Sequence, residues 1–352
     1  MRRQTRNFKL GDVGIGSNFP ISVQSMTKTN TRDIKSTVDQ IKDLEVMGCN
    51  IIRCAVPDIE AAKALKGIVK NIDIPLVADI HFEYTLALEA IRSGINGLRI
   101  NPGNIGSKKR IKQVVESAKG SGIPIRIGVN SGSLEKDILA KHGSPTSDAL
   151  VESALRHISI LDEFNFNDIK VSVKSSNVNI MLESYRKLSE LSDVPLHLGV
   201  TEAGTSEIGS IKSSIGIGSL ICDGIGDTIR VSLTDNPLEE VKMGKNILKA
   251  LGHFENGIEL ISCPGCGRLE IDLKSLVDEV ESRISRMKIK RSLKVSILGC
   301  VVNGPGEALG SDIGIAGGRG KGQIYKNGKI YKSCKEDEIV DILVEEIEKL
   351  NS

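Results

Sequence analysis

The segment PLVADIHFEYTLALEAIRSGINGLRINP, residues 75–102, contains one complete strand-helix-strand unit. Its two ends, 75–80 and 97–102, have the length and composition of buried strands, and the residues between them carry apolar side chains at helical spacing. The same alternation extends in both directions, with strands predicted at 21–26, 51–56, 75–80, 97–102, 123–129, 169–175, 195–201 and 227–234. Eight such units predict an α/β fold, a TIM (β/α)₈ barrel over residues 1–250. A doubly wound sheet is disfavoured because Met26-Thr27-Lys28-Thr29, after the first strand, lacks the glycine-rich turn of that fold.

The pattern changes near Leu251, so a second domain is predicted over residues 251–352. A chain of 352 residues also exceeds the size at which a single core usually stops growing. The Asn327-Gly328 pair between two short strands favours a type I′ hairpin turn. With predicted strands at 258–262 and 293–298, a helix at 270–287, a glycine-rich turn region and a terminal helix, this part has the pattern of a smaller α+β domain.

Composition excludes several classes of protein. The 47 Lys and Arg residues nearly balance the 45 Asp and Glu residues, and aromatic residues make up only 3% of the chain, which disfavours a nucleic-acid-binding protein. The chain has neither an apolar signal segment near its start nor a run of about eighteen apolar residues, so neither secretion nor a membrane partner is indicated. Seven cysteines without a small secreted framework favour reduced thiols or metal ligands. A cytoplasmic protein is therefore predicted.

Three cysteines lie at the ends of predicted strands in the second domain. The sequence CPGCGR at 263–268 gives Cys263 and Cys266 CxxC spacing, and Cys300 ends the next predicted strand. The loop that follows Cys300 can return Glu307 to the same site as a fourth, harder ligand. Three thiolates and one carboxylate would leave one iron of an iron-sulfur cluster able to exchange its oxygen ligand, which suits catalysis. A cluster that only transfers electrons usually has four cysteines.

Other interpretations of the cysteines remain open. A closed zinc site would use Cys334 or His253 as its fourth ligand, and a disulfide or inert core cysteines form a third possibility. We interpret Cys49, Cys54 and Cys222, which lie within predicted barrel elements, as small buried hydrophobic residues.

Polar side chains gather at the carboxyl ends of the predicted barrel strands, where TIM barrels build their active sites. Five of the eight strands carry an arginine or a lysine. Converging cations are costly without an anion, and guanidinium groups match phosphate oxygens, so a diphosphate is the simplest ligand. For any single arginine a structural salt bridge is an equal alternative, and His81 is either structural or a proton donor. The full set is Arg53, Asp79, His81, Arg99, Arg126, Asn130, Lys174, Glu202, Arg230 and Ser232.

These motifs resemble those of the 4-hydroxy-3-methylbut-2-enyl diphosphate synthases, reductases of the methylerythritol phosphate pathway of isoprenoid biosynthesis. The resemblance extends over essentially the whole chain. The chain resembles the compact two-domain members of the family and lacks the large inserted domain of the plant-type members. It is carried by ISVQSMTKT, IIRCAVP, ADIHF, LRINPGNIG, IRIGVNSGSLE, VSVKSS, LGVTEAG, GDTIRVSLT, SCPGCGR and LGCVVNGPGE.

The resemblance implies a reaction and a set of roles. The substrate would be 2-C-methyl-D-erythritol 2,4-cyclodiphosphate, whose ring is opened by two electrons with loss of water, and the electrons would come from reduced flavodoxin or ferredoxin. A 4Fe-4S cluster would be held by Cys263, Cys266, Cys300 and Glu307, and Glu307 and Glu202 would be catalytic. The resemblance also implies a homodimer in which the cluster domain of one subunit closes over the barrel of the other. The substrate would be bound by Arg53, Asp79, Arg99, Arg126, Asn130, Lys174, Arg230 and Ser232.

Two other functions fit parts of the sequence. A barrel aldolase or phosphosugar lyase would use Lys174 as a Schiff base beside a structural zinc domain, and it would be active without iron. A redox-sensing iron-sulfur protein that is not an enzyme would need the cluster but no converging cations.

Overall fold

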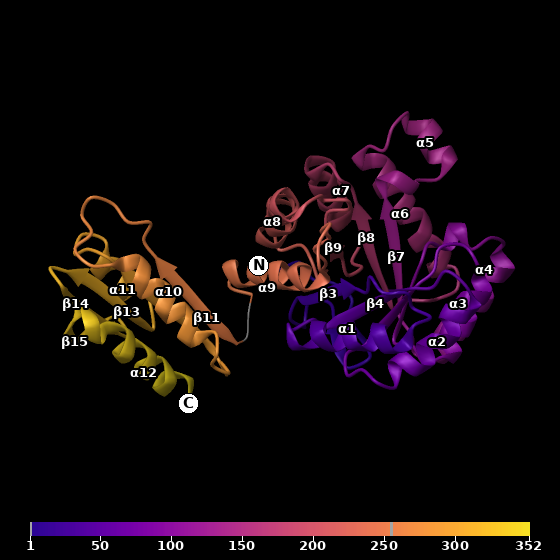
Figure 1. Cartoon of the computed structure of the whole chain (residues 1–352). Coiled ribbons are helices and arrows are strands. Elements are labelled where there is room, and N and C mark those ends of the chain that lie inside the picture. The colour runs from indigo at the N-terminus through magenta and orange to yellow at the C-terminus, as the bar shows by residue number, and fades with distance from the viewer. Residues whose placement is uncertain (1, 254–255) are drawn as a thin grey trace. The chain divides into compact units, whose positions relative to one another are not determined.

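The structure is a computed structural model that describes residues 2–253 and 256–352. It divides into two compact units, one ending at His253 and the other containing the described residues from Asn256 onward (Figure 1). The larger unit is an α/β barrel and the smaller one an α+β domain, so the predicted fold class is confirmed.

Eight parallel strands form the barrel, in the order β8-β7-β6-β5-β4-β3-β10-β9. A bridge between Val171 and Leu196 joins β8 to the segment that leads into β9, so the sheet closes on itself. The strands are β3 (Ser22–Met26), β4 (Ile51–Ala55), β5 (Leu76–Asp79), β6 (Gly97–Ile100), β7 (Ile125–Asn130), β8 (Ile169–Lys174), β9 (His197–Leu198) and β10 (Thr228–Ile229).

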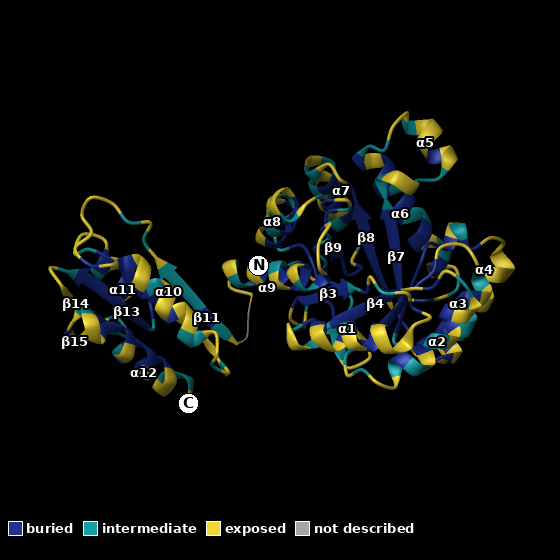
Figure 2. Cartoon of the chain, in the orientation of Figure 1, coloured by how far each residue is buried: buried dark blue, intermediate teal, exposed yellow. Residues whose placement is uncertain are grey.

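Helices surround the barrel and bury one apolar face each (Figure 2). In the helix after β3, for example, Val38, Ile41 and Leu44 are buried, at the spacing of one helical face. The helices are α1 (Ile34–Val46), α2 (Ile59–Val69), α3 (Tyr84–Arg92), α4 (Lys108–Gly120), α6 (Ser147–Asp162), α7 (Val178–Leu191), α8 (Ser206–Cys222) and α9 (Pro237–Ala250). The extra helix α5 (Lys136–His142) lies between β7 and α6.

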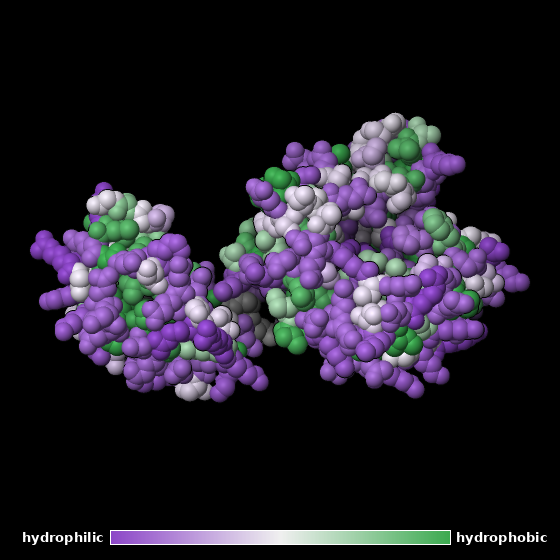
Figure 3. All heavy atoms as spheres, in the orientation of Figure 1, coloured by the Kyte–Doolittle hydropathy of each residue, from purple (hydrophilic) through white to green (hydrophobic). Residues whose placement is uncertain are grey.

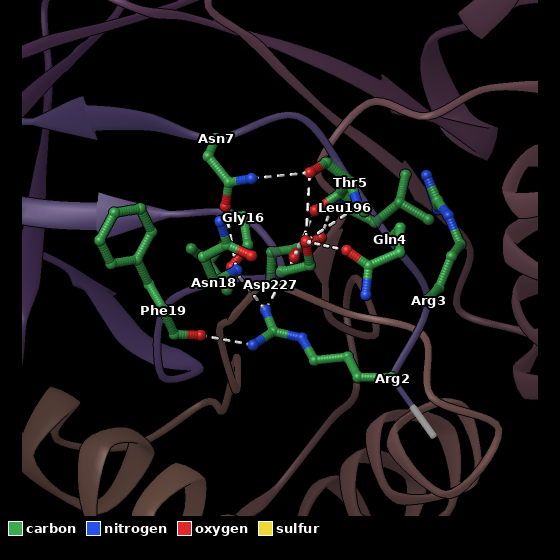
Figure 4. Close-up of polar contacts among 12 residues, drawn as sticks. Arg2, Arg3, Gln4, Thr5, Asn7, Gly16, Asn18, Phe19, Leu196 and Asp227 are labelled. Carbon is green, nitrogen blue, oxygen red and sulfur yellow. Dashed lines mark hydrogen bonds and ion pairs between the residues drawn. The ribbon is translucent and has the colours of Figure 1, made fainter.

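The N-terminal residues pack against the amino-terminal end of the barrel. These residues form a hairpin of β1 (Phe8–Leu10) and β2 (Val13–Ile15), which shares a hydrophobic cluster with Ile51 and Val77 of the barrel strands. Beside it, the buried carboxylate of Asp227 accepts hydrogen bonds from Arg2 at 2.7 Å, from the Thr5 hydroxyl at 3.1 Å and from the Leu196 amide at 2.8 Å (Figure 4). These contacts lie at the end of the barrel opposite to the carboxyl ends of the strands.

The smaller unit has a five-stranded sheet in the order β11-β12-β13-β14-β15, in which β11, β12 and β13 are parallel and the last two pairings are antiparallel. Asn327 and Gly328 both have positive φ angles, 48° and 72°, which confirms the predicted type I′ turn. The elements are β11 (Gly257–Ser262), α10 (Leu273–Ile284), β12 (Ser292–Leu298), α11 (Gly304–Leu309), β13 (Ile313–Gly318), β14 (Lys321–Lys326), β15 (Lys329–Lys335) and α12 (Ile339–Asn351).

The two faces of this sheet are covered differently. Ile313 and Ile315 of β13 share a core with residues of α10 and α12, whereas Ala316 packs with Ala308 of α11 on the other face. Glycine is required for the close approach of α11, because a Cβ on Gly304 would lie 2.6 Å from the Cβ of Ala316. The sheet thus fixes the short helix that follows Cys300.

Three details differ from the sequence-based predictions. The run after Cys300 was expected to be a loop but contains α11, and β13 was hidden in the glycine-rich region. The last two barrel strands are regular over only two residues each. Cys49 and Cys54 are buried as expected, but Cys222 is exposed because it lies at the end of α8.

Hydrophilic side chains cover most of the surface in view (Figure 3). Among the described residues, no helix is long and apolar enough to cross a lipid bilayer.

Candidate active site

One cavity of the barrel is lined by all eight side chains that the sequence predicts to bind substrate. It lies at the carboxyl ends of the strands, and His81 and Thr201 also line it. Thr201 was not singled out from the sequence, although its place at the end of the predicted strand 195–201 was the available signal. Glu202, the next residue, has a positive φ of 51° and is not among the residues that line the cavity.

Asp79 is the centre of the ion pairs in this cavity. Its carboxylate lies 3.0 Å from Nη1 of Arg99 and 3.5 Å from Nε of Arg53, and both arginines are buried. His81 approaches the same carboxylate at 3.6 Å. Burial by itself would raise the pKa of Asp79, but Arg53, a hydrogen bond from His81 and Arg99 outweigh it and hold that pKa far below its ordinary value. Asp79 is therefore ionised and orients the two guanidinium groups.

The remaining cations have fewer acidic partners. Arg126, only 3% exposed, donates a hydrogen bond to the Ser172 hydroxyl at 2.7 Å. Arg230 lies 3.7 Å from the buried carboxylate of Glu240. Within the described parts of the chain, Lys174 has no recorded hydrogen bond or ion pair. A Cβ on Gly199 would lie 2.5 Å from its Nζ, so glycine makes room for this ammonium group.

The pKa values show how strongly these charges oppose one another. Burial first, and then Arg126 and Arg230, lower the pKa of Lys174 well below its ordinary value. Burial and the neighbouring Arg53 and Arg99 lower the pKa of Arg126 in the same way. Five buried or nearly buried cations thus face two buried carboxylates. An anion bound among them would stabilise all five, which is the electrostatic signature of a phosphate site.

Lys170 is a further buried cation that the sequence analysis missed. It lies on β8 opposite Arg126 in the strand pairing, as Lys174 lies opposite Asn130, and its alternation with Lys174 could have revealed it. Lys170 is 2% exposed, and its Nζ has no hydrogen-bond partner among the described residues. Burial first, and then Arg126 and Arg53, lower its pKa from 10.5 to about 7.

Replacing Lys170 by Met is expected to stabilise the barrel, most strongly at low pH. Because its pKa is lower in the folded state than in the unfolded state, protonation of Lys170 favours unfolding, fully below about pH 7 and not at all above 10.5. The gain in the free energy of unfolding of Lys170→Met over the unmodified chain should therefore shrink between about pH 7 and pH 10. Denaturant titrations at both pH values measure this, with Lys63→Met, at an exposed position of α2, as the control. A gain that does not change with pH would contradict the prediction.

The three predicted cysteine ligands line one cavity of the smaller unit. Cys263 follows β11 and Cys300 follows β12, and the two parallel strands end side by side. The Gly299 amide donates to the Cys263 sulfur at 3.5 Å, and Arg268 approaches the Cys266 sulfur at 3.8 Å. All seven cysteines are free in the structure.

The fourth ligand is less directly placed. Glu307 lies in the first turn of α11, is exposed, and is not among the residues that line the cysteine cavity. Across the described ranges, no three His, Cys, Asp or Glu side chains are arranged to hold one metal ion. Three thiols around one cavity are a donor set that suits a thiolate-bound metal or iron-sulfur group.

Neither residue proposed to complete a zinc site belongs to this cavity. Cys334 is buried in the hydrophobic core of the smaller unit, where its thiol faces the Gly322 carbonyl. His253 belongs to the larger unit and lines a different cavity there.

Both units match known protein families and their members. Residues 5–245 match the GcpE TIM-barrel domain and residues 259–349 the GcpE protein C-terminal domain. The barrel also resembles a dihydropteroate synthase from Stenotrophomonas maltophilia, with a TM-score of 0.51, 11% identity, and coverage of 70% of this chain and 97% of that one, which supports the fold alone.

Full-length relatives carry one name. The 4-hydroxy-3-methylbut-2-en-1-yl diphosphate synthase (flavodoxin) of Clostridium acetobutylicum is 59% identical over 349 residues, 99% of each chain. The protein of the same name from Geobacter sulfurreducens is 51% identical over 350 residues, again 99% of each chain. Because this identity runs through both units, the chain belongs to the 4-hydroxy-3-methylbut-2-en-1-yl diphosphate synthase family.

Proposed function

We propose that this protein reduces 2-C-methyl-D-erythritol 2,4-cyclodiphosphate to 4-hydroxy-3-methylbut-2-enyl diphosphate. Two electrons and two protons are consumed, the bond between carbon and the ring diphosphate oxygen breaks, and one hydroxyl leaves as water. The observation that carries the proposal is the barrel cavity, whose lining includes five cations and a single carboxylate, that of Asp79. The family membership supports the same reaction.

The substrate's diphosphate would be held by the cavity residues. Guanidinium groups of Arg53, Arg99 and Arg126 offer paired donors to phosphate oxygens, and Lys174 adds a point charge. Asn130 and Ser232 provide neutral polar groups at the same mouth. Glu202, the residue after Thr201, would exchange protons with the substrate's departing hydroxyl or with its carbon. The negative charge of Asp79 keeps two arginines oriented rather than binding the anion itself.

An iron-sulfur group is expected from the family, and we propose a 4Fe-4S cluster bound by Cys263, Cys266, Cys300 and Glu307. When bound, the cluster would supply single electrons and a Lewis-acidic iron. The protein's own part is to present three thiols around one cavity and to hold Glu307 on a helix packed firmly against the sheet. A carboxylate that is exposed and outside the thiol cavity suits a ligand that must be displaced.

Flavodoxin is the proposed electron donor, because the relatives' name specifies it. The homodimer and the cytoplasmic location remain predictions from the sequence.

Anaerobic purification followed by iron analysis tests the function directly. Brown protein that turns over the cyclic diphosphate with dithionite is expected. Colourless protein with one zinc per chain would contradict the proposal, and so would turnover of a phosphosugar without iron, which the Schiff-base aldolase hypothesis predicts.

Replacing Glu307 by Ala should lower turnover about 10- to 100-fold while the protein stays brown, with an altered absorption or electron paramagnetic resonance spectrum. The loss is that typical of a disturbed metal environment, because three thiolates remain. Glu279→Ala, at an exposed position of α10, is the matched control and should leave the turnover and the spectrum unchanged. Unchanged turnover in Glu307→Ala would remove this residue from the catalytic role.

A further inference from the structure

Two loops at the mouth of the barrel meet at one buried histidine. The first loop follows β6 and contains the short helix η1 (Pro102–Asn104); the second follows β7 and begins with η2 (Ser131–Ser133). His157 of α6 is 1% exposed and lies between them. It is not one of the residues that line the substrate cavity.

Both ring nitrogens of His157 face a partner. The Gly103 amide in the first loop donates to Nδ1 at 3.2 Å, and Nε2 lies 2.8 Å from a carboxylate oxygen of Glu135 in the second. Because Nδ1 accepts a hydrogen bond, a neutral ring carries its proton on Nε2, the nitrogen nearer to Glu135.

Glu135 is held in its ionised form by these contacts. Its other carboxylate oxygen accepts from the Ser153 hydroxyl at 2.7 Å. Burial by itself would raise the pKa of Glu135, but the hydrogen bonds with His157 and Ser153 outweigh it and lower that pKa to about 2. A charged carboxylate therefore faces the proton on Nε2 of His157 at neutral pH.

The first loop approaches the imidazole of His157 closely. A Cβ on Gly103 would lie 2.7 Å from Cε1 of His157, so only glycine permits this approach. The same loop is fixed at its start, where the buried side chain of Asn101 accepts from the Gly128 amide at 2.9 Å. The second loop starts directly after Asn130, which lines the cavity. Glu135 is thus only a few residues along the chain from a group that lines the substrate cavity.

We propose that His157 is a positioning residue that holds these two loops in the geometry needed to bind the substrate diphosphate. The proposal rests on the proposed function for the identity of the ligand. Displacing binding groups by about 1 Å can cost about 100-fold in rate or affinity. Since Asn130 and the other cavity residues would bind the substrate and its transition state alike, their displacement should appear in KM rather than in kcat.

Three variants separate positioning from simple stabilisation. His157→Leu removes both polar contacts and should raise KM about 10- to 100-fold, with kcat changed by less than about threefold and iron content unchanged. His157→Gln, whose side-chain oxygen can accept from Gly103 and whose amide can donate to Glu135, should restore most of the affinity. His142→Leu is the matched control, because His142 forms a similar 2.8 Å contact with Glu152 of α6 but does not contact η1. It should leave KM unchanged.

Affinity for inorganic diphosphate, measured by calorimetry on the same variants, provides a readout that is independent of turnover. If the unmodified protein binds diphosphate but does not reduce the cyclic substrate, the proposed function fails and the role of His157 is still tested. KM and affinity do not depend on the fraction of folded protein, so partial misfolding does not obscure the result. Equal values in His157→Leu, His142→Leu and the unmodified protein would overturn the proposal, as would a loss in His157→Leu that His157→Gln does not restore.

Discussion

Replacing Cys300 by Ser should give colourless protein whose reductase activity is at least about 10³-fold lower, because in the proposed function the electrons reach the substrate through a cluster that this thiol helps to hold. Cys300 shares its cavity with Cys263 and Cys266, and the strands that present Cys263 and Cys300 are adjacent. A serine hydroxyl is a much poorer ligand for iron than a thiolate. Iron content and visible absorption, measured after anaerobic purification, check the first part of this result, and dithionite-driven turnover checks the second.

The same substitution at Cys222 provides the control. This thiol is free and exposed, and it lies at the end of α8 in the larger unit, so Cys222→Ser should keep both colour and activity. If Cys300→Ser retained full iron content and turnover, the cluster ligands would have to be sought elsewhere. If both variants lost activity while retaining iron, oxidation of exposed thiols rather than ligation would explain the cysteine dependence.

The fold followed from the sequence because buried parallel strands read as short apolar runs between amphipathic helices. The barrel cavity followed for a related reason. Side chains alternate along a strand, so Arg126 and Asn130 on β7 could be assigned to one side, and the carboxyl ends of parallel strands meet at one edge. The residues that line the cavity can therefore be identified from the sequence at the end of each strand.

What escaped prediction depends on tertiary packing. Gly304-Pro305-Gly306 reads as a turn, yet proline near the first helical position and burial of Ala308 against the sheet make it the start of α11. The contacts of His157 with Gly103 and Glu135 join residues that are far apart in the chain. No periodic pattern reports such a contact. The position of Lys170 beside Arg126 could have been predicted from the strand alternation. The burial of the Lys170 side chain without a hydrogen-bond partner among the described residues could not, because this burial depends on how the barrel closes.

Replacing Lys174 by Met should weaken binding of the cyclic diphosphate by about 2–4 kcal/mol, roughly 30- to 1,000-fold, as expected for a buried charge removed from an anion site. Lys174 has no carboxylate partner within the described residues, so its charge is available to the substrate, and methionine roughly preserves the length of the side chain. Lys170→Met is a close control, because Lys170 lies on the same face of the same strand, four residues before Lys174, and does not line the cavity. It should change affinity less than about threefold at about pH 8, where a pKa of about 7 leaves most of Lys170 uncharged.

The pattern of the kinetic constants for Lys174→Met also distinguishes two chemistries. A residue that binds the diphosphate raises KM when it is removed, and Lys174→Arg, which keeps the charge, should recover much of the affinity. If Lys174 instead formed a Schiff base, both variants would lose kcat, because neither methionine nor arginine can form the imine. Borohydride would then trap the substrate on the unmodified protein. The burial that lowers the pKa of Lys174 suits either role. Borohydride trapping and the behaviour of Lys174→Arg therefore decide between the two roles.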